Sequence, residues 1–312
     1  MVKVQKLPYL ALKCLISSLG PVEKIDFSLC SKKCRRAVKI CTPKDSVKVT
    51  LNFTRHSHLT LNAVDCDEVS ILDSDKLFKQ LHHINRGNFN EIIIPWADYT
   101  CDVLNCKVNG MVFDICSQKT LSQINRWLKV RKESLQYCEI QEDFPRSHYV
   151  YILRNFDIEL LNFNKNKSLK DYEWFVTIKK KLCLNMRDDQ RVHLETILDC
   201  SCPQIEVHYG KWRRYDVYLF VSAWLRGILP DLSLFVITEL DYFSLEDILR
   251  GIDATKLDDN VENRYIGIFN DNKVISGGWD IRRNDGEIAT IKMSSNNGQA
   301  MFRLVSHSLF LN

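Results

Sequence analysis

The chain has 312 residues with a formal net charge of +4, and 45% of its residues are hydrophobic. This length predicts about two domains of roughly 150 residues each. The small net charge argues against a strong nucleic-acid binder, which usually has a clustered basic bias. No apolar run approaches the roughly 20 residues that span a bilayer, so we predict no membrane segment.

The first apolar stretch, residues 7–39, has the pattern of three short helices. Pro8 suits the first turn of a helix, where its missing N–H is not needed. An apolar stripe at i, i+3, i+4 and i+7 follows: Leu12, Leu15, Ile16 and Leu19. Because Pro8, Lys13, Gly20 and Pro21 interrupt the apolar residues and no small-residue cleavage site follows, we expect no signal peptide. We therefore expect an intracellular protein, in the cytoplasm, the nucleus or both.

Two further helices follow the first one closely. Gly20-Pro21 ends one helix and opens the next, whose stripe is Val22, Ile25 and Leu29. Ser31 is a suitable N-cap for a third helix over residues 32–39, with Cys34 and Val38 inward. A unit of fewer than about 40 residues rarely folds alone. These helices therefore either bind another protein or cap the domain that follows.

The same residues resemble a known motif. Leu7-Pro8, Leu15, Leu19, Gly20-Pro21 and Ser28-x-Cys30-Ser31-Lys32 resemble an F-box, in the form common in nematode F-box proteins. The resemblance implies docking on a Skp-family adaptor, and through it on the cullin of a ubiquitin ligase. The adaptor-facing positions that it implies are Leu7, Pro8, Leu15, Leu19, Pro21 and Val22. The sequence departs from the family pattern at Lys24, where leucine is usual, and at Tyr9-Leu10, where an acidic residue is common.

The third helix carries a basic run. Its members are Lys32, Lys33, Arg35, Arg36 and Lys39. Such a run is able to contact phosphates, but no aromatic residue interleaves the charges as in a nucleic-acid platform. We therefore interpret it as a solvated helix face and predict no nucleic-acid partner.

After a linker at residues 41–46, two stretches of the sequence resemble each other. Residues 126–140 parallel residues 223–237: Trp127 and Trp224 each begin a Trp-Leu-basic run, and apolar residues follow at the same offsets. We expect both tryptophans in the core. An alternating strand precedes each run, around Met111 and Phe113 in one and around Ile205 and Val207 in the other. A weaker copy has a strand at residues 69–71, a helix at 77–84 and a strand at 91–95. We also expect strands at residues 148–153 and 173–184.

Repeated strand–helix–strand units predict a mostly parallel sheet with helices on one side. One such unit does not bury its apolar faces alone, whereas stacked units do. We therefore expect a short, irregular leucine-rich-repeat-like layer. The alternative is a coincidence of generic α/β patterning, since only one pair of stretches matches well.

The C-terminal part gives a second resemblance. Residues 221–237, 245–254 and 277–291 resemble, in this order, blocks of the type 2 F-box-associated domain of nematodes. The resemblance implies a domain that recruits targets. The segment Asn284-Asp285-Gly286 also favours a tight turn, which predicts a C-terminal β-hairpin.

The predicted fold class is therefore α+β, in three regions. They are an F-box-like helical domain at 1–42, an α/β repeat-like region at 47–196 and an F-box-associated type 2-like domain at 197–312. The predicted function is the substrate-recognition subunit of a Skp–cullin–F-box ubiquitin ligase. The alternative is a repeat-type protein-interaction scaffold without a ligase.

Enzyme motifs are missing from the sequence. We find no P-loop, G-x-G-x-x-G, G-x-S-x-G or H-E-x-x-H, so we predict no catalytic, cofactor-binding or metal-binding residues and a non-catalytic protein. The twelve cysteines indicate reduced, mostly buried thiols. Their close pairs, Cys30/Cys34, Cys101/Cys106 and Cys200/Cys202, leave a metal site as the less favoured alternative. A catalytic Cys–His pair is a further alternative, since such partners meet in space.

The target-binding surface is predicted on two loops, residues 208–216 and 283–287, because specificity often lies on loops held by a rigid layer. The first carries Trp, Tyr and Arg, the residue types enriched in binding hot spots. The predicted target-binding residues are Trp212, Arg213, Arg214 and Tyr215. The alternative is that Trp212 folds back on the core while the arginines stay solvated.

Overall fold

The computed structural model describes residues 7–54, 57–64, 69–72, 90–114, 116–141, 145–164, 180–185, 192–240, 242–296 and 299–311. The chain forms two compact units, Met1–Ile158 and Glu159–Asn312. The boundary between them lies inside the predicted 47–196 region, and the N-terminal helices belong to the first unit. The three predicted domain ranges stay a prediction.

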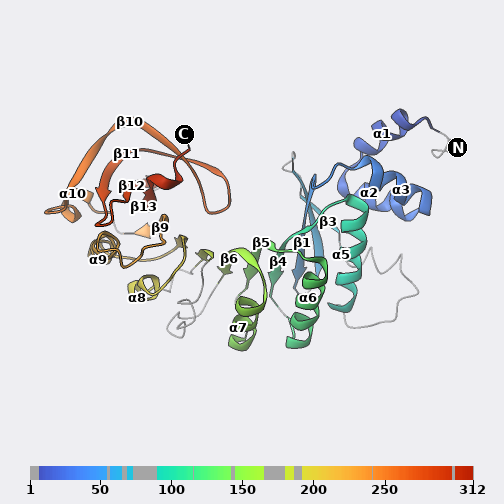
Figure 1. Cartoon of the computed structure of the whole chain (residues 1–312), viewed down its shortest axis with the longest axis horizontal. Helices are drawn as coiled ribbons and strands as arrows, with labels where there is room; N and C mark the ends of the chain where they lie inside the picture. Colours follow the sequence, from blue (N-terminus) through green and yellow to red (C-terminus); the bar gives the residue numbers. More distant parts are fainter. Residues whose placement is uncertain are drawn as a thin grey trace. The chain divides into compact units, whose positions relative to one another are not determined.

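Three helices open the first unit, as the sequence indicated (Figure 1). They are α1 (Tyr9–Ser17), α2 (Pro21–Leu29) and α3 (Lys32–Cys41). The Ser31 side chain accepts a hydrogen bond from the Cys34 N–H at 3.1 Å and so caps α3. At the start of α2, Glu23 accepts a hydrogen bond from the Gly20 N–H at 2.8 Å. These local signals explain why the boundaries of the short helices were predictable.

The described residues of the first unit form five strands in the order β5-β4-β1-β2-β3. Their bounds are β1 (Val47–Phe53), β2 (His58–Ala63), β3 (Val69–Leu72), β4 (Val108–Phe113) and β5 (Leu135–Ile140). Strands β1, β4 and β5 pair in parallel, whereas β2 and β3 pair antiparallel. The helices of the layer are α5 (Asn90–Leu104), α6 (Gln118–Arg131) and α7 (Arg146–Asn155), and α6 and α7 lie on one side of the sheet, below the strands in Figure 1.

The predicted strand at residues 91–95 is wrong, because this segment is the start of α5. Ile93, Trp96, Ala97, Thr100 and Cys101 are all buried. Their spacing of three and four residues places them on one helix face. Burial of that face outweighs the local preference of the isoleucine run for a strand and the cost of Pro95 inside the helix.

The weak third copy of the strand–helix–strand unit is therefore not formed as predicted. Strand β3 lies where a strand was expected, but it pairs antiparallel with β2. The predicted helix at residues 77–84 lies outside the described residues.

The predicted strand at residues 148–153 is also wrong, since α7 occupies this segment. Tyr149, Ile152 and Phe156 are buried at intervals of three and four residues. Pro145 stands at the N-cap position. The aromatic and β-branched residues suggested a strand, but the buried stripe has the helical period.

In the part of the second unit that the structure describes, eight strands follow the order β10-β11-β12-β13-β9-β8-β7-β6. Four of them pair in parallel: β6 (Ile158–Asn164), β7 (Lys181–Asn185), β8 (Gln204–His208) and β9 (Leu234–Leu240). The others form an antiparallel meander that continues from β9: β10 (Ala254–Ile266), β11 (Asn272–Arg282), β12 (Ile288–Asn296) and β13 (Gln299–Ser306). Of the strand predicted at 173–184, residues 181–184 belong to β7, and residues 173–179 lie outside the described part of the chain.

Helices α8 (Leu194–Leu198), α9 (Arg214–Leu225) and α10 (Leu245–Ile248) connect strands of the second unit, and the short 3-10 helix η4 (His307–Leu309) follows β13. Two of the predicted strand–helix–strand units are present: β4–α6–β5 in the first unit and β8–α9–β9 in the second, each with parallel strands. The leucine-rich-repeat-like character of the whole stays a prediction.

The C-terminal meander returns to its own first strand. Tyr265 of β10 forms an isolated bridge with Phe310, and the Leu311 N–H donates to the Arg264 carbonyl at 2.8 Å. The end of the chain therefore covers part of the outer edge of β10. The predicted hairpin is confirmed: β11 pairs with β12, and the turn has Gly286 at φ +96°, a conformation that glycine adopts without strain.

No helix within the described residues is long and apolar enough to cross a membrane.

Candidate functional site

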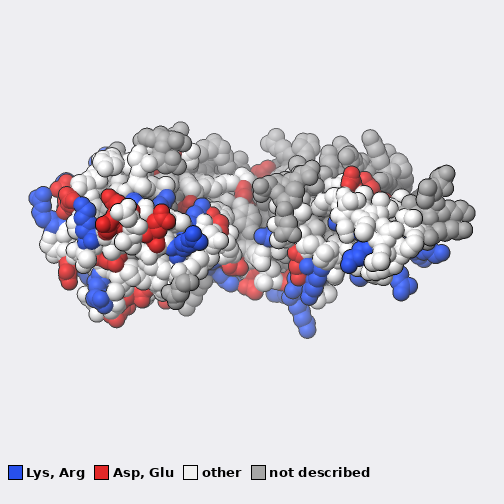
Figure 2. Space-filling model, turned by 90° about the horizontal axis from the view of Figure 1, so that it is seen from above, with Lys and Arg blue, Asp and Glu red and all other residues white. Residues whose placement is uncertain are grey.

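Helix α1 presents an apolar surface to solvent. Tyr9 is 56% exposed, Leu10 is 73% exposed and Leu15 is 37% exposed, and Pro8 and Ala11 are also exposed. We call these five residues the α1 surface. Figure 2 shows the N-terminal helices, at its right, as mostly white with few charged side chains. A cluster of exposed large apolar side chains on one short helix is typical of a protein-binding surface.

The cause of this exposure lies in the packing of α1. Ile16 is its one buried residue among those described, and α1 packs against α3. Leu12, at i−4 from Ile16, is half-buried. The predicted apolar stripe is therefore only partly buried: Ile16 packs inward, and Leu15 faces solvent.

The predicted adaptor-facing residues all lie on the accessible side of these helices. Pro8 and Leu15 are exposed. The remaining four are half-buried: Leu7, Leu19, Pro21 and Val22. Lys24, which departs from the family pattern, is also half-buried, and this burial lowers the pKa of its ammonium group.

Polar contacts join the N-terminal helices to α5. The Ser28 hydroxyl and the Tyr99 hydroxyl are 2.8 Å apart, and the Arg35 guanidinium lies 4.6 Å from the centre of the Tyr99 ring. Asp102 accepts hydrogen bonds from Lys39 at 2.5 Å and from Arg35 at 2.7 Å. The hydrogen bond from Lys39, with that from Arg35, lowers the pKa of the Asp102 carboxyl.

These contacts account for part of the basic run. Arg35 and Lys39 are bound by Asp102 within the first unit, whereas Lys32, Lys33 and Arg36 are exposed. Helices α2 and α3 are therefore fixed against the α/β layer by side chains of α5.

A comparison with protein families identifies this helical segment. The family model of the F-box domain matches residues 4–46. The chain carries an F-box domain. The match covers α1, α2 and α3 and ends where β1 begins. No curated protein and no solved structure matches the chain.

Trp212, predicted to bind a target, is instead a core residue. It has no exposed surface, and its Nε1–H donates to the Val192 carbonyl at 2.8 Å. Its ring stacks on Phe235 with centroids 5.3 Å apart. The interpretation of Trp212 as a contact residue is therefore wrong, and the alternative that it folds back on the core is correct.

The other three predicted target-binding residues are exposed at the start of α9. Arg213 is the N-cap residue, and its N–H donates to the Asp216 carboxylate at 2.8 Å. Arg214 lies 3.6 Å from Asp247 of α10. Tyr215 is 67% exposed and stacks with Tyr218, with ring centroids 6.5 Å apart.

Sequence reasoning missed Tyr218, which shares the exposed face of Tyr215. The available signal was the i, i+3 spacing of two tyrosines on a helix whose other face is apolar. Target binding by these residues stays a prediction.

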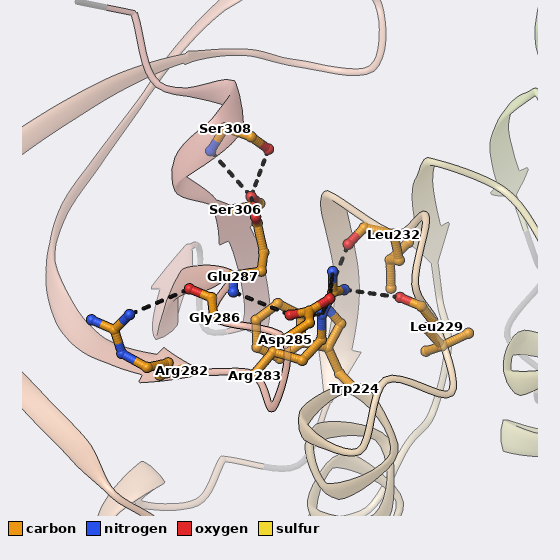
Figure 3. A network of polar contacts seen from close by, with 10 residues as sticks. All are labelled: Trp224, Leu229, Leu232, Arg282, Arg283, Asp285, Gly286, Glu287, Ser306 and Ser308. Carbon is orange, nitrogen blue, oxygen red and sulfur yellow. Dashed lines mark hydrogen bonds and ion pairs between the residues drawn. The ribbon is translucent and has the colours of Figure 1, made fainter.

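The second predicted recruiting loop, residues 283–287, is anchored by a buried arginine (Figure 3). The Arg283 guanidinium donates to the Leu229 carbonyl at 3.2 Å and pairs with Asp285 at 2.8 Å. It also lies 5.0 Å from the centre of the Trp224 ring. The hydrogen bond from Arg283 lowers the pKa of the Asp285 carboxyl. Arg283 therefore holds the turn against the loop after α9 and is not available to a partner.

The described residues do not assemble a metal-binding cluster. No group of three or more His, Cys, Asp or Glu side chains with metal-site geometry occurs among them. Eleven cysteines are described, all as free thiols, and Cys14 and Cys30 alone among these are exposed. Burial raises the pKa of Cys116 to about 12 and raises that of Cys138 as well, which disfavours the reactive thiolate.

One cluster in the second unit has the residue types of a catalytic triad. The Thr290 hydroxyl donates to Asp280 at 2.6 Å, and His307 Nε2 lies 3.1 Å from Thr290 and 3.2 Å from Asp280. A catalytic relay requires the two ring nitrogens to face different partners. Here the same nitrogen faces both, so the cluster lacks this relay geometry and joins β11, β12 and η4.

Proposed function

We propose that this chain is the substrate-recognition subunit of a Skp–cullin–F-box ubiquitin ligase. The F-box at residues 4–46 supports this role, because an F-box is an adaptor-binding module of such ligases. The F-box binds a Skp-family adaptor, and through it a cullin, while the rest of the chain recruits a protein target. The chain acts in the cytoplasm, the nucleus or both.

The α1 surface is the observation that carries the proposal. It combines Pro8 of the Leu7-Pro8 motif with exposed Tyr9, Leu10 and Leu15. Apolar and aromatic side chains are typical of the buried centre of a protein interface, where charged residues are depleted. Helix α1 contains Lys13 as its one charged residue.

The chain performs no chemistry in this proposal. Its effect is proximity, since holding a target near the ubiquitin-charged enzyme turns a bimolecular encounter into a local one. The contacts of Asp102 and Tyr99 with α2 and α3 serve this role, because they fix the F-box relative to the sheet of the first unit.

The alternative function is a protein-interaction scaffold without a ligase, in which the N-terminal helices cap the α/β core. The packing of α2 and α3 on α5 agrees with a cap. A cap, however, needs no exposed apolar residues on its outer helix, and the α1 surface has them. This difference favours the receptor over the scaffold.

Residues 197–312 are proposed to form a type 2 F-box-associated domain of the nematode kind and to recruit the target. The three blocks of the resemblance fall on α9–β9, on α10 and on the β11–β12 hairpin. Arg213, Arg214 and Tyr215 stay the proposed contact residues, and Trp212 is withdrawn.

Size-exclusion chromatography tests the proposed function. The purified full-length chain is mixed with a purified Skp-family adaptor, and we expect the two to elute together as a complex. Adaptor and chain that elute separately, each folded by circular dichroism, contradict the ligase role and leave the scaffold.

A further inference from the structure

We propose that the exposed face of α9 binds an acidic segment of a partner protein. The face consists of the exposed Tyr215 and Tyr218, with Arg213 and Arg214 at the start of the helix and Arg226 at its end, and we call these five residues the Tyr–Arg face. The inference rests on the proposed function, because it names the chemistry of the target that the receptor recruits.

The Tyr–Arg face is continuous along the helix. Tyr215, Tyr218, Ser222 and Arg226 follow at i, i+3, i+7 and i+11, which places them on one side of α9. The opposite side is embedded in the core through Val217, Phe220, Val221 and Trp224. The exposed side chains therefore stand on a rigid helix, so binding costs little ordering of the backbone.

The two tyrosines supply an apolar anchor with polar ends. Tyr215 is 67% exposed and Tyr218 is 42% exposed, and their rings are stacked at 27°. Neither hydroxyl makes a hydrogen bond to the described part of the chain. Stacked exposed tyrosines offer a large contact area with few rotatable bonds, which is why tyrosine is common at binding hot spots.

The charges around the tyrosines are predominantly positive. Lys211, Arg213 and Arg226 are exposed and form no ion pair with a residue that the structure describes. Arg214 and Arg250 share a single carboxylate, Asp247, at 3.6 and 3.1 Å.

The acidic groups nearby are already engaged. Asp216 accepts the Arg213 N–H at the helix start, and Glu246 lies 3.6 Å from Lys256. The face therefore has cations in excess of the carboxylates that neutralise them, and its electrostatic complement is an acidic partner.

Carboxylates fit this face better than nucleic-acid phosphates do. The cations border one pair of tyrosines and do not line a long groove, whereas nucleic-acid platforms combine a basic track with several stacking rings. Arginine binds carboxylate in a bidentate geometry, and each tyrosine hydroxyl can donate to a second carboxylate oxygen. An acidic peptide segment with apolar residues between its carboxylates satisfies both features.

Fluorescence anisotropy with synthetic peptides tests the inference. The full-length chain is titrated into a fluorescein-labelled peptide built from Glu-Glu-Leu-Phe repeats, and into peptides with Gln or Lys in place of Glu. We expect the Glu peptide to bind about tenfold or more tightly than the Gln peptide, and the Lys peptide not to bind. Added salt should weaken the binding, since exposed charges are screened.

Variants locate the binding on the face. Arg213→Glu/Arg226→Glu and Tyr215→Ala/Tyr218→Ala should each weaken binding of the Glu peptide about tenfold, the loss of a hot-spot contact. The matched control is Arg126→Glu/Lys129→Glu, which makes the same charge change on exposed residues of α6. Circular dichroism and the melting temperature check that each variant is folded.

The inference is wrong if the Glu peptide does not bind, or if the α6 control loses as much peptide affinity as the α9 variants. It is also wrong if an oligothymidylate binds more tightly than the Glu peptide and loses affinity in the same α9 variants. Adaptor co-elution of the same variants separates this inference from the proposed function. Retained adaptor binding without peptide binding contradicts the Tyr–Arg face alone. If the unaltered chain does not bind the adaptor, the ligase role is contradicted, whether or not the Glu peptide binds.

Discussion

Trp127 and Trp224 begin the same sequence pattern but are buried to different extents. Trp224 has no exposed surface, and its Nε1–H donates to the Leu232 carbonyl at 3.3 Å. Trp127 is half-buried, and its Nε1–H donates to Asp98 at 2.9 Å. The sequence pattern placed both indoles in the core. The prediction that Trp127 lies in the core is wrong, because its ring is only half-buried and lies beside Arg131.

This difference predicts unequal effects of truncation. Trp224→Ala removes a fully buried indole and should lower the free energy of unfolding by about 3–5 kcal/mol. Trp127→Ala removes a half-buried ring and one hydrogen bond to a charged group, and should cost about 1–2 kcal/mol. Urea unfolding followed by circular dichroism measures both. Equal losses would show that the two indoles are buried alike in solution.

Arg283 provides a second prediction, because it is a buried charge with defined partners. Arg283→Ala leaves the Leu229 carbonyl without its donor and Asp285 without its cation, and should cost about 2–4 kcal/mol in the free energy of unfolding. Arg282→Ala is the control, since Arg282 is exposed and contacts the Gly286 carbonyl at 3.4 Å. The same chemical denaturation experiment compares them. A loss no larger than that of the control would mean that Arg283 does not anchor the turn.

At the scale of elements, the sequence predicts a helix well where capping residues mark its ends. It predicts a helix poorly where only the packing of its buried face stabilises it. Ser31 and Ser117 cap α3 and α6 through their side chains, and Gly20-Pro21 separates α1 from α2. The sequence predicts strands for the start of α5 and for most of α7, because isoleucine, valine and tyrosine have a local β preference. Their buried residues recur with a helical period. In such short segments, packing against other elements determines whether a helix or a strand forms.

The contact between α3 and α5 depends on the charge of one residue. Asp102 has a lowered pKa because it accepts hydrogen bonds from Lys39 and Arg35. A lowered folded-state pKa means that the charged carboxylate stabilises the fold above the ordinary value of 3.8. This stabilisation is lost as the pH falls below 3.8 and through the lower folded-state value.

We therefore expect a pH-dependent effect of Asp102→Asn. The three side chains are more than a third exposed, so the variant should lose less than about 1 kcal/mol of unfolding free energy at neutral pH. The difference from the unaltered chain should shrink as the pH is lowered through 3.8. Urea unfolding over this pH range measures it. The control is Asp26→Asn on α2, an exposed residue whose carboxylate pairs with no described side chain. A difference that stays constant with pH would contradict the proposed contact.

At the scale of the whole molecule, local sequence predicted units but not their long-range pairing. The parallel β4–α6–β5 and β8–α9–β9 units follow from patterns within about 35 residues of sequence. The β11–β12 hairpin follows from Asp285-Gly286. The pairing of β13 with β9 and the return of Phe310 to Tyr265 join segments far apart in the chain, and nothing local specifies them.

The candidate site was predictable to a similar degree. The α1 surface follows from the Leu7-Pro8 motif, because short helices with many apolar residues must leave some of them exposed. Trp212 was misassigned because tryptophan is equally suited to a core and to a binding hot spot, and composition alone does not separate them. Its burial depends on Phe235 and Val192, which lie outside the loop itself.

The last prediction concerns the binding of the chain to its adaptor. Leu7→Ala, Pro8→Ala and Leu15→Ala should each weaken adaptor binding, by about 1–4 kcal/mol, as truncation of buried interface anchors does. The fold should be little affected, because Pro8 and Leu15 are exposed and Leu7 is half-buried. The matched control is Val130→Ala, which truncates an apolar side chain of α6 that is 79% exposed. Isothermal titration calorimetry with the purified adaptor gives the affinities. If all three variants bind as tightly as the control, the α1 surface does not contact the adaptor, and the N-terminal helices act as a cap of the α/β core.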